Sequence, residues 1–348
     1  MIIITLFTTG KTGLLYGWRY DFEFLIAFSI LFHGARFLSK TSGYYIKLVL
    51  ISWGIALFLS LLVRFVFSPD ILLYFGFSGN PSNWEFWVAP PIFHGVDGAN
   101  VQRFQGILDG PNSMGAFLII YAGLVAYYFR NKKEWHYIVG LFLIFCLGLE
   151  FLTYSRSALW GFIIGVMIVF IDSLQVLFRR YKKELFFVGT FVIICFWIFS
   201  IQYRDKAEAL LAREGSSKWH FQRMIVGVDR FMEHPLGQGL GSSGPGYRYV
   251  LARQGMTQEE IQAQEPYYIP ESWYIQQLVE WGIFGFLFFL AFFLMLGYML
   301  FQSSILLFAI FVGLCGMNFF LHTFEVTYLA ILIFMIFGMI LAQSREKK

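Results

Sequence analysis

Apolar runs of about the length that crosses a bilayer recur along most of this 348-residue chain. A bilayer core takes about 20 apolar residues in a helix, and a helix satisfies its own backbone hydrogen bonds in lipid. Hydrophobic residues make up 58% of the chain and charged residues 14%, whereas soluble domains carry about 25% charged residues. The pattern predicts an all-α polytopic membrane protein with about ten transmembrane helices. The predicted spans are 2–17, 22–38, 44–68, 112–129, 135–153, 157–178, 185–201, 281–301, 304–321 and 324–342.

Two long polar segments, 69–111 and 202–271, interrupt the apolar runs, and clusters of Lys and Arg follow other runs. The clusters are Arg36, Lys40 and Lys47; Arg130, Lys132 and Lys133; Arg179, Arg180, Lys182 and Lys183; and Arg345, Lys347 and Lys348. Alternating spans bring all four to one side, which the positive-inside rule assigns to the cytoplasm together with the C-terminus. We therefore expect residues 1–348 to form a single transmembrane domain, with 69–111 as a first outer loop and 202–271 as a long outer loop with short helices. The net charge of +4 then reflects topology, and no nucleic-acid partner is predicted.

Motifs for nucleotides and metals are missing from the sequence. It contains no P-loop, dinucleotide fingerprint, His-x-Glu or Cys-x-x-Cys motif. Cys146, Cys195 and Cys315 all lie in apolar runs, where cysteine acts as a small hydrophobic residue. These observations predict no cofactor and no metal site, and they argue against a nucleotide-driven pump or a metal hydrolase.

The segment 153–157, Thr-Tyr-Ser-Arg-Ser, lies at the expected outer mouth between two spans. Arg156 there has two interpretations: its side chain extends toward lipid headgroups, or its guanidinium grips a pyrophosphate. Ser155 or Ser157 is expected to cap the following helix, whose positive end attracts anions.

Residues 218–233 show the spacing of an amphipathic helix, with Phe221, Ile225, Val228 and Phe231 on one face. Arg223 and Arg230, seven apart, share another face. A helix on the membrane surface with a solvated basic stripe explains this periodicity. The Gly-rich run 237–246 that follows is typical both of close backbone approach to a ligand and of plain turns.

Several carboxylates and polar groups near span ends are further candidates. Asp109 or Asn112 is expected to cap the helix that starts near Ser113. Glu271 and Glu280 lie where a helix enters apolar surroundings. Glu271 has two interpretations. It is a negative charge that the dipole at the helix N-terminus stabilises, or it is a general base whose pKa is raised by partial burial.

Two further patterns predict local structure. His322 and Glu325, three apart between the last two spans, are expected to pair with each other, in preference to a catalytic role. Thr257–Glu260 has the pattern of a capping box.

Four segments in order resemble the O-antigen ligase and O-antigen polymerase superfamily of bacterial inner membranes. They are Arg103–Gly106 with Pro111 and Asn112; Thr153–Ser157; Arg223 followed by His234–Gly241; and Glu271–Trp273 with Leu278–Gly285. The resemblance rests on the ordered set of motifs together with the long loop expected outside. The resemblance implies transfer of a glycan from an undecaprenyl pyrophosphate carrier at the periplasmic face of the inner membrane, without metal or nucleotide.

By this resemblance, Arg156 and Arg223 match the arginines that hold the carrier pyrophosphate, and Glu271 stands where ligases typically place a histidine base. That departure favours a polymerase, which joins the glycan to a sugar hydroxyl of another lipid-linked repeat unit. Further candidates for substrate contact are Arg103, Asn112, Tyr154, His220, Arg230, Glu280 and His322. The implied partners are the lipid-linked donor and acceptor, membrane lipids, and a chain-length regulator and a flippase of the same pathway. The product is a surface polymer such as lipopolysaccharide O-antigen or exopolysaccharide.

Three other functions compete with a polymerase. A ligase that transfers the glycan to lipid A core or to protein differs only in the acceptor. A transporter or flippase for lipid-linked sugars is expected to show internal repeats and charges at mid-membrane, and here the polar residues cluster toward the outer face. A structural scaffold leaves Arg156 and Glu271 without a purpose.

Overall fold

The computed structural model describes residue 5 and residues 8–38, 40–79, 90–92, 102–180 and 214–345. These residues form helices, and β-pairing among them is limited to a bridge between Ser78 and Pro91. The α-helices are α2 (Gly10–Gly34), α3 (Ser42–Phe65), α4 (Pro111–Phe129), α5 (His136–Thr153), α6 (Arg156–Arg180), α9 (Glu214–Glu233), α10 (Tyr247–Arg253), α11 (Gln258–Tyr268), α12 (Trp273–Ser303), α13 (Ile305–Met317) and α14 (Thr327–Arg345). Short 3-10 helices are η1 (Ala35–Phe37), η2 (Pro69–Phe75), η3 (Lys133–Trp135) and η5 (Thr323–Glu325).

Five of the described helices are long and apolar enough to cross a membrane, and two apolar helices are shorter. The five are Ser42–Phe65, Pro111–Phe129, Lys133–Thr153, Trp273–Ser303 and Thr327–Ser344; the shorter ones are Arg156–Phe170 and Ile305–Met317. The all-helical membrane fold is confirmed, whereas the count of about ten spans is not. The predicted spans 2–17 and 22–38 are not separate, because Gly10–Gly34 is one continuous helix. The predicted span 185–201 lies outside the described residues.

Helix packing in the bundle relies on aromatic side chains and on small residues. α2 packs along α14, around a cluster of buried aromatic rings. The rings are Phe24, Trp273, Phe293, Phe324 and Phe334. α6 crosses α13 at Gly161 and Gly313, where a Cβ atom on Gly161 would lie 2.6 Å from the Gly313 carbonyl oxygen. Such contacts between small residues let membrane helices approach closely.

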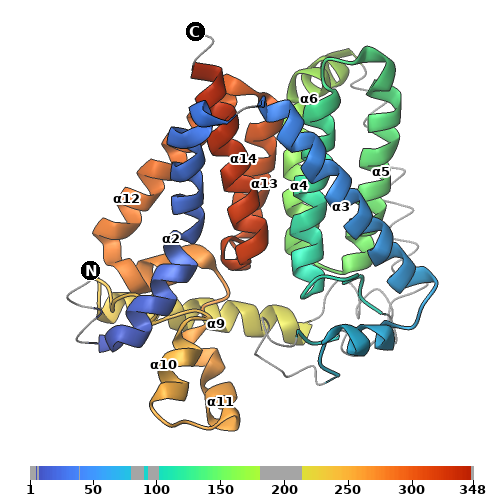
Figure 1. Ribbon diagram of the computed structural model, residues 1–348. Coiled ribbons are helices and arrows are strands. Elements are labelled where there is room, and N and C mark those ends of the chain that lie inside the picture. The colour runs from blue at the N-terminus through green and yellow to red at the C-terminus, as the bar shows by residue number, and fades with distance from the viewer. Residues whose placement is uncertain are drawn as a thin grey trace.

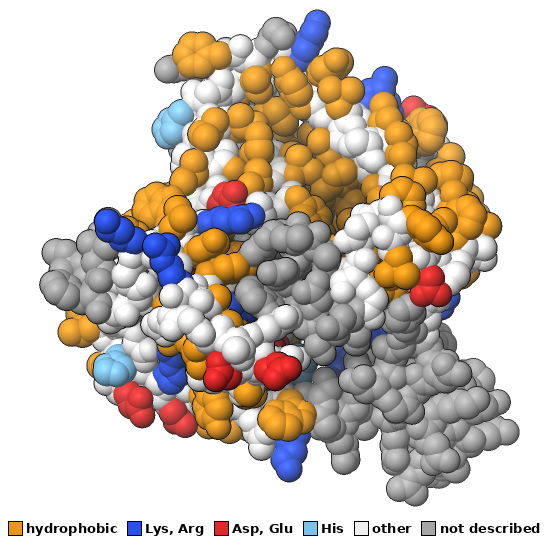
Figure 2. Space-filling model, turned by 60° about the horizontal axis from the view of Figure 1, so that its bottom comes forward, with side chains coloured by type: hydrophobic (Ala, Val, Ile, Leu, Met, Phe, Trp, Pro, Cys, Tyr) orange, Lys and Arg blue, Asp and Glu red, His pale blue; other side chains and the backbone are white. Residues whose placement is uncertain are grey.

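The two ends of the bundle differ in chemistry. The α2–α3 and α4–α5 turns and the C-terminus lie at the upper end, and α9, α10, α11 and η2 lie at the lower end (Figure 1). Charged side chains gather on the lower end, below a body rich in hydrophobic side chains (Figure 2). The described Lys and Arg residues of the basic turns are therefore at the end opposite the long loop.

α12 is broken at Gly282, and the Gly-rich segment fills the break. Gly282 has φ 67° and ψ −177°, a backbone conformation that only glycine adopts readily. The Gln238 and Gly239 amides donate to the carbonyls of Val279 (2.8 Å) and Glu280 (3.0 Å). The Ile283 amide donates in turn to the Pro235 carbonyl at 2.9 Å. The loop thus supplies backbone partners at the break in α12.

Replacing Gly282 with alanine is expected to destabilise the protein by at least about 2 kcal/mol, because the φ is strained for any L residue. A Cβ atom would also lie 2.3 Å from the Leu236 carbonyl carbon. The thermal midpoint of the detergent-solubilised protein measures this. Gly148→Ala is the control, since nothing lies within 4 Å of a Cβ there. Equal midpoints for the two variants would contradict this account of the break.

Candidate functional site

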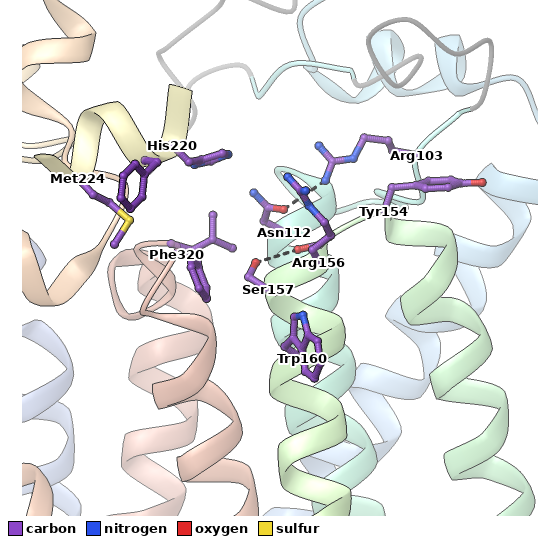
Figure 3. A pocket seen from close by; sticks show the side chains of 12 residues that line it. Arg103, Asn112, Tyr154, Arg156, Ser157, Trp160, His220, Met224 and Phe320 are labelled. Carbon is purple, nitrogen blue, oxygen red and sulfur yellow. Dashed lines mark hydrogen bonds between the residues drawn. The ribbon is translucent and has the colours of Figure 1, made fainter. Parts of the chain in front are cut away.

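A cavity of about 390 Å³ opens at the lower end of the bundle, between the α5–α6 turn and α9 (Figure 3). Polar side chains and exposed aromatic rings share its walls. The lining residues are Arg103, Asn112, Tyr154, Ser155, Arg156, Ser157, Trp160, His220, Phe221, Met224, Phe320 and Leu321. Five residues that the sequence singled out, Arg103, Asn112, Tyr154, Arg156 and His220, therefore meet at one cavity.

The α5–α6 turn places Arg156 at this cavity. α5 ends at Thr153, and the next residue, Tyr154, adopts a left-handed conformation with φ 51°. The Ser155 hydroxyl accepts from the Ala158 amide at 3.4 Å, so the predicted capping role of Ser155 is confirmed. Arg156 is the first residue of α6, and its guanidinium lies at the cavity wall together with the positive end of that helix (Figure 3). This wall suits an anion.

Arg103 and Asn112 form a second polar pair on the same wall. The Arg103 Nη2 atom donates to Asn112 Oδ1 at 3.2 Å, and its Nε atom donates to the Thr153 carbonyl at 3.0 Å. The predicted capping of the next helix by Asp109 or Asn112 is wrong. α4 has Gly110 as N-cap without a side-chain cap, because Asn112 accepts from Arg103 and Asp109 accepts from the Tyr328 hydroxyl at 2.8 Å.

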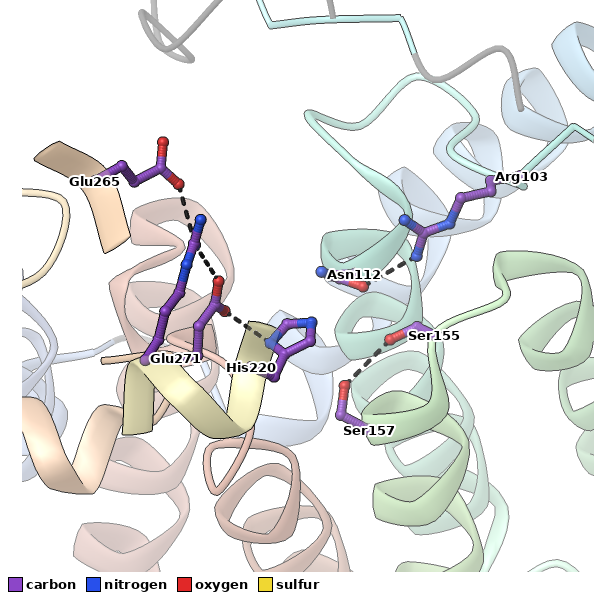
Figure 4. A network of polar contacts seen from close by, with 8 residues as sticks. Arg103, Asn112, Ser155, Ser157, His220, Glu265 and Glu271 are labelled. Carbon is purple, nitrogen blue, oxygen red and sulfur yellow. Dashed lines mark hydrogen bonds and ion pairs between the residues drawn. The ribbon is translucent and has the colours of Figure 1, made fainter. Parts of the chain in front are cut away.

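The opposite wall carries His220, which contacts a carboxylate outside the cavity lining. The Nδ1 atom of His220 lies 3.1 Å from Oε2 of Glu271, and the imidazole ring extends toward the side of the cavity that holds Asn112 and Ser155 (Figure 4). Both residues of the pair were predicted candidates, although the sequence did not predict that they touch.

Arg223 lies behind this pair, and it is not a lining residue of the cavity. Its Nη1 atom donates to Glu271 Oε1 at 2.5 Å and to Glu265 Oε1 at 3.3 Å. Glu265 also pairs with Arg248 at 3.4 Å. The predicted pyrophosphate ligand Arg223 is thus engaged by two carboxylates, one of which is the predicted base.

The predicted raised pKa of Glu271 is wrong, because the pKa is lowered overall. Burial, the largest influence, does raise this pKa. The hydrogen bond and charge of His220, together with Arg223 and His322, outweigh it and hold the pKa below the ordinary value of 4.5. Glu271 is therefore ionised at neutral pH, and its carboxylate is suited to orienting the His220 ring.

His322 does not pair with the Glu325 side chain. Glu325 Oε1 accepts from Gln276 Nε2 at 2.6 Å. Burial lowers the pKa of His322 to about 4, and the charge of Glu271 opposes that shift, so this imidazole is neutral at pH 7. Its Nε2 atom is buried without a hydrogen-bond partner in the described part of the chain.

Arg230 and Glu280 lie outside the cavity lining and hold the Gly-rich segment in place. Arg230 donates to the Gln238 side chain and to the Ser242 carbonyl. The two carboxylate oxygens of Glu280 accept from the amides of Gly241 (3.1 Å) and Ser243 (3.2 Å). The basic stripe of α9 therefore contacts the rest of the loop, and the expectation of a fully solvated stripe is wrong.

The cavity also has an apolar part that the sequence reasoning missed. Trp160, Phe221 and Phe320 line it, and each of these side chains is at least half exposed. The sequence signal for this apolar part was the place of Phe221 on the apolar face of the predicted helix 218–233. Among the described residues, no group of three or more His, Cys, Asp or Glu residues has the arrangement of a metal site.

Residues 139–290 match a family model, Wzy_C, described as O-Antigen ligase. The matched segment runs from α5 into α12 and includes Arg156, His220, Arg223 and Glu271. Arg103, Asn112 and His322 lie outside it. No curated protein and no solved structure matches the chain.

Proposed function

We propose that this chain polymerises a surface polysaccharide, because residues 139–290 match the O-Antigen ligase family model. It transfers a glycan from an undecaprenyl pyrophosphate carrier to a sugar hydroxyl of a second lipid-linked repeat unit, without metal or cofactor. The observation that carries the proposal is one cavity with Arg156 and Arg103 on one wall and His220, which contacts Glu271 behind it, on the other.

The arginine wall holds the donor. A guanidinium presents planar donors that match two phosphate oxygens at once, and the α6 N-terminus adds a positive end. Arg156 neutralises the charge that develops on the departing pyrophosphate. Arg103, fixed by Asn112 and the Thr153 carbonyl, contributes a second positive charge.

The opposite wall activates the acceptor. The Nδ1 atom of His220 lies 3.1 Å from Glu271 Oε2; with the proton on Nδ1, the other ring nitrogen is an acceptor, and it takes the proton of the incoming hydroxyl. The oxygen–carbon bond forms at the anomeric carbon as the bond to pyrophosphate breaks, with inversion there. Glu271 orients the ring and stabilises the imidazolium, as the carboxylate of a catalytic triad does.

This assignment changes two roles predicted from the sequence. Glu271 becomes the positioning carboxylate and His220 the base, because Glu271 has a lowered pKa and lies outside the cavity lining. Arg223 becomes the residue that fixes Glu271, since its guanidinium is already shared by Glu271 and Glu265.

The apolar part of the cavity suits a lipid-linked substrate. Trp160, Phe221 and Phe320 are exposed around it; Trp is enriched at the membrane interface, and the two Phe rings offer apolar surface to a lipid chain. The basic turns at the far end of the bundle support a cytoplasmic C-terminus in the bacterial inner membrane and a cavity facing the periplasm.

The length of surface polysaccharide in a strain that lacks this protein tests the proposal. Single repeat units on their normal anchor are expected, with long chains restored by the wild-type gene. Full-length polymer that accumulates on its lipid carrier would show a ligase, the second candidate, which the description of the matched family favours. Unchanged polysaccharide would overturn both and favour a transporter.

A further inference from the structure

A second cavity, of about 380 Å³, lies among α4, α5, α6 and α13. Its lining comes from the parts of α4 and α5 nearest their connecting turn, so it lies toward the upper end in Figure 1, opposite the candidate site. Nothing in the proposed reaction uses it.

The walls of this second cavity, which we call the groove, are almost entirely apolar. Leu143, Phe162 and Ile310 are among the side chains that line it, and Gly140, which has no side chain, leaves it open beside α5. A Cβ atom on Gly140 would meet nothing within 4 Å. From His136 to Leu143 the groove follows α5 for about 10 Å, a large part of the thickness of one bilayer leaflet.

Positive charge lies at the turn end of the groove. Arg130 and His136 line it, and the same turn carries Lys132 and Lys133 against one acid, Glu134. Arg130 donates to the Tyr127 carbonyl at 2.6 Å, and its guanidinium carbon lies 3.8 Å from the centre of the Tyr127 ring. No carboxylate of the described residues forms an ion pair with Arg130.

We propose that this groove binds an anionic phospholipid, with an acyl chain along Gly140 and Leu143 and the headgroup phosphate at Arg130. The apolar trench matches the chain, and the exposed cations match the headgroup in charge. Basic pockets between membrane helices at the cytoplasmic surface bind anionic headgroups in this manner. The site is independent of the proposed glycan transfer, since the two cavities share no residue.

Photocrosslinking tests the site directly. The full-length protein is reconstituted in phosphatidylcholine nanodiscs that contain phosphatidylglycerol with a photoreactive acyl chain, and labelled peptides are mapped by mass spectrometry. Labelling is expected at 139–143 and 162–170. Gly140→Leu is expected to reduce it to background by filling the groove, and Arg130→Gln to reduce it about fivefold, the effect expected for one basic contact with an anionic headgroup.

Gly148→Leu is the matched control, because Gly148 is on the same helix, equally open to a Cβ atom, and outside the groove. It is expected to keep full labelling, and size-exclusion profiles check the folding of each variant. Three results would overturn the proposal: equal labelling in Gly140→Leu and Gly148→Leu, equal labelling by a neutral phosphatidylcholine probe, or labelling only by a polyprenyl phosphate probe.

Discussion

Arg156→Ala is expected to slow glycan transfer by about 10²–10³-fold, the loss typical of removing one group that stabilises developing charge. Arg156 lies at the cavity wall at the start of α6, and in the proposed reaction its charge offsets that of the leaving pyrophosphate. The rate is measured with a lipid-pyrophosphate-linked repeat unit and the purified protein. Arg156→Lys is expected to recover part of the rate, since an ammonium keeps the charge and loses the two-pronged geometry.

The control for Arg156 is Arg253→Ala. Arg253 is an exposed cation in the last turn of α10 at the same end of the molecule, and it is absent from the cavity lining. Its removal is expected to leave the rate unchanged. Equal rates for Arg156→Ala and the wild type, at equal protein levels in the membrane, would exclude a role for Arg156 in holding the donor.

His220→Gln is expected to lower kcat by about 10²–10⁴-fold, the usual contribution of a positioned proton acceptor. His234→Gln, at the exposed end of α9, is the matched control with no expected effect. Glu271→Gln is expected to slow the reaction as well, because an amide orients the His220 ring less effectively and does not stabilise the imidazolium.

The pH profile separates the roles of His220 and Glu271. Histidine is the side chain whose charge ordinarily changes between about pH 5 and 8, so a fall in rate on acidification within that range indicates a histidine base. With Glu271 as base, the fall would come below 4.5, because its pKa is lowered from that value. We therefore expect the residual activity of Glu271→Gln to fall on acidification over the same pH range as that of the wild type. A wild-type limb below 4.5 would return the base role to Glu271.

Local patterns predicted local structure well. The helix at 218–233 is confirmed as part of α9, and Thr257 and Glu260 form the predicted capping box. Both depend on residues within a few turns of one another. By contrast, the contact between His220 and Glu271 joins α9 to the segment before α12, and periodicity carries no information on such a pairing.

The N-terminal spans show how tertiary contacts override a local signal. The predicted spans 2–17 and 22–38 leave a gap that contains Asp21, yet α2 continues through it. Asp21 is buried and accepts from Gln277 at 2.9 Å and from Trp281 at 2.8 Å. A buried carboxylate is tolerated when it is hydrogen-bonded, and these partners lie far away in the sequence.

The break at Gly282 also constrains the order of assembly during biosynthesis. Backbone groups left unpaired in lipid cost several kcal/mol each, and Val279, Glu280 and Ile283 obtain partners from 235–239. The loop segment is synthesised first, so it is already available when the ribosome releases α12. We expect the first turns of α12 to remain outside the hydrocarbon until that segment docks, so that docking of residues 235–239 and final insertion of this helix are a single cooperative event.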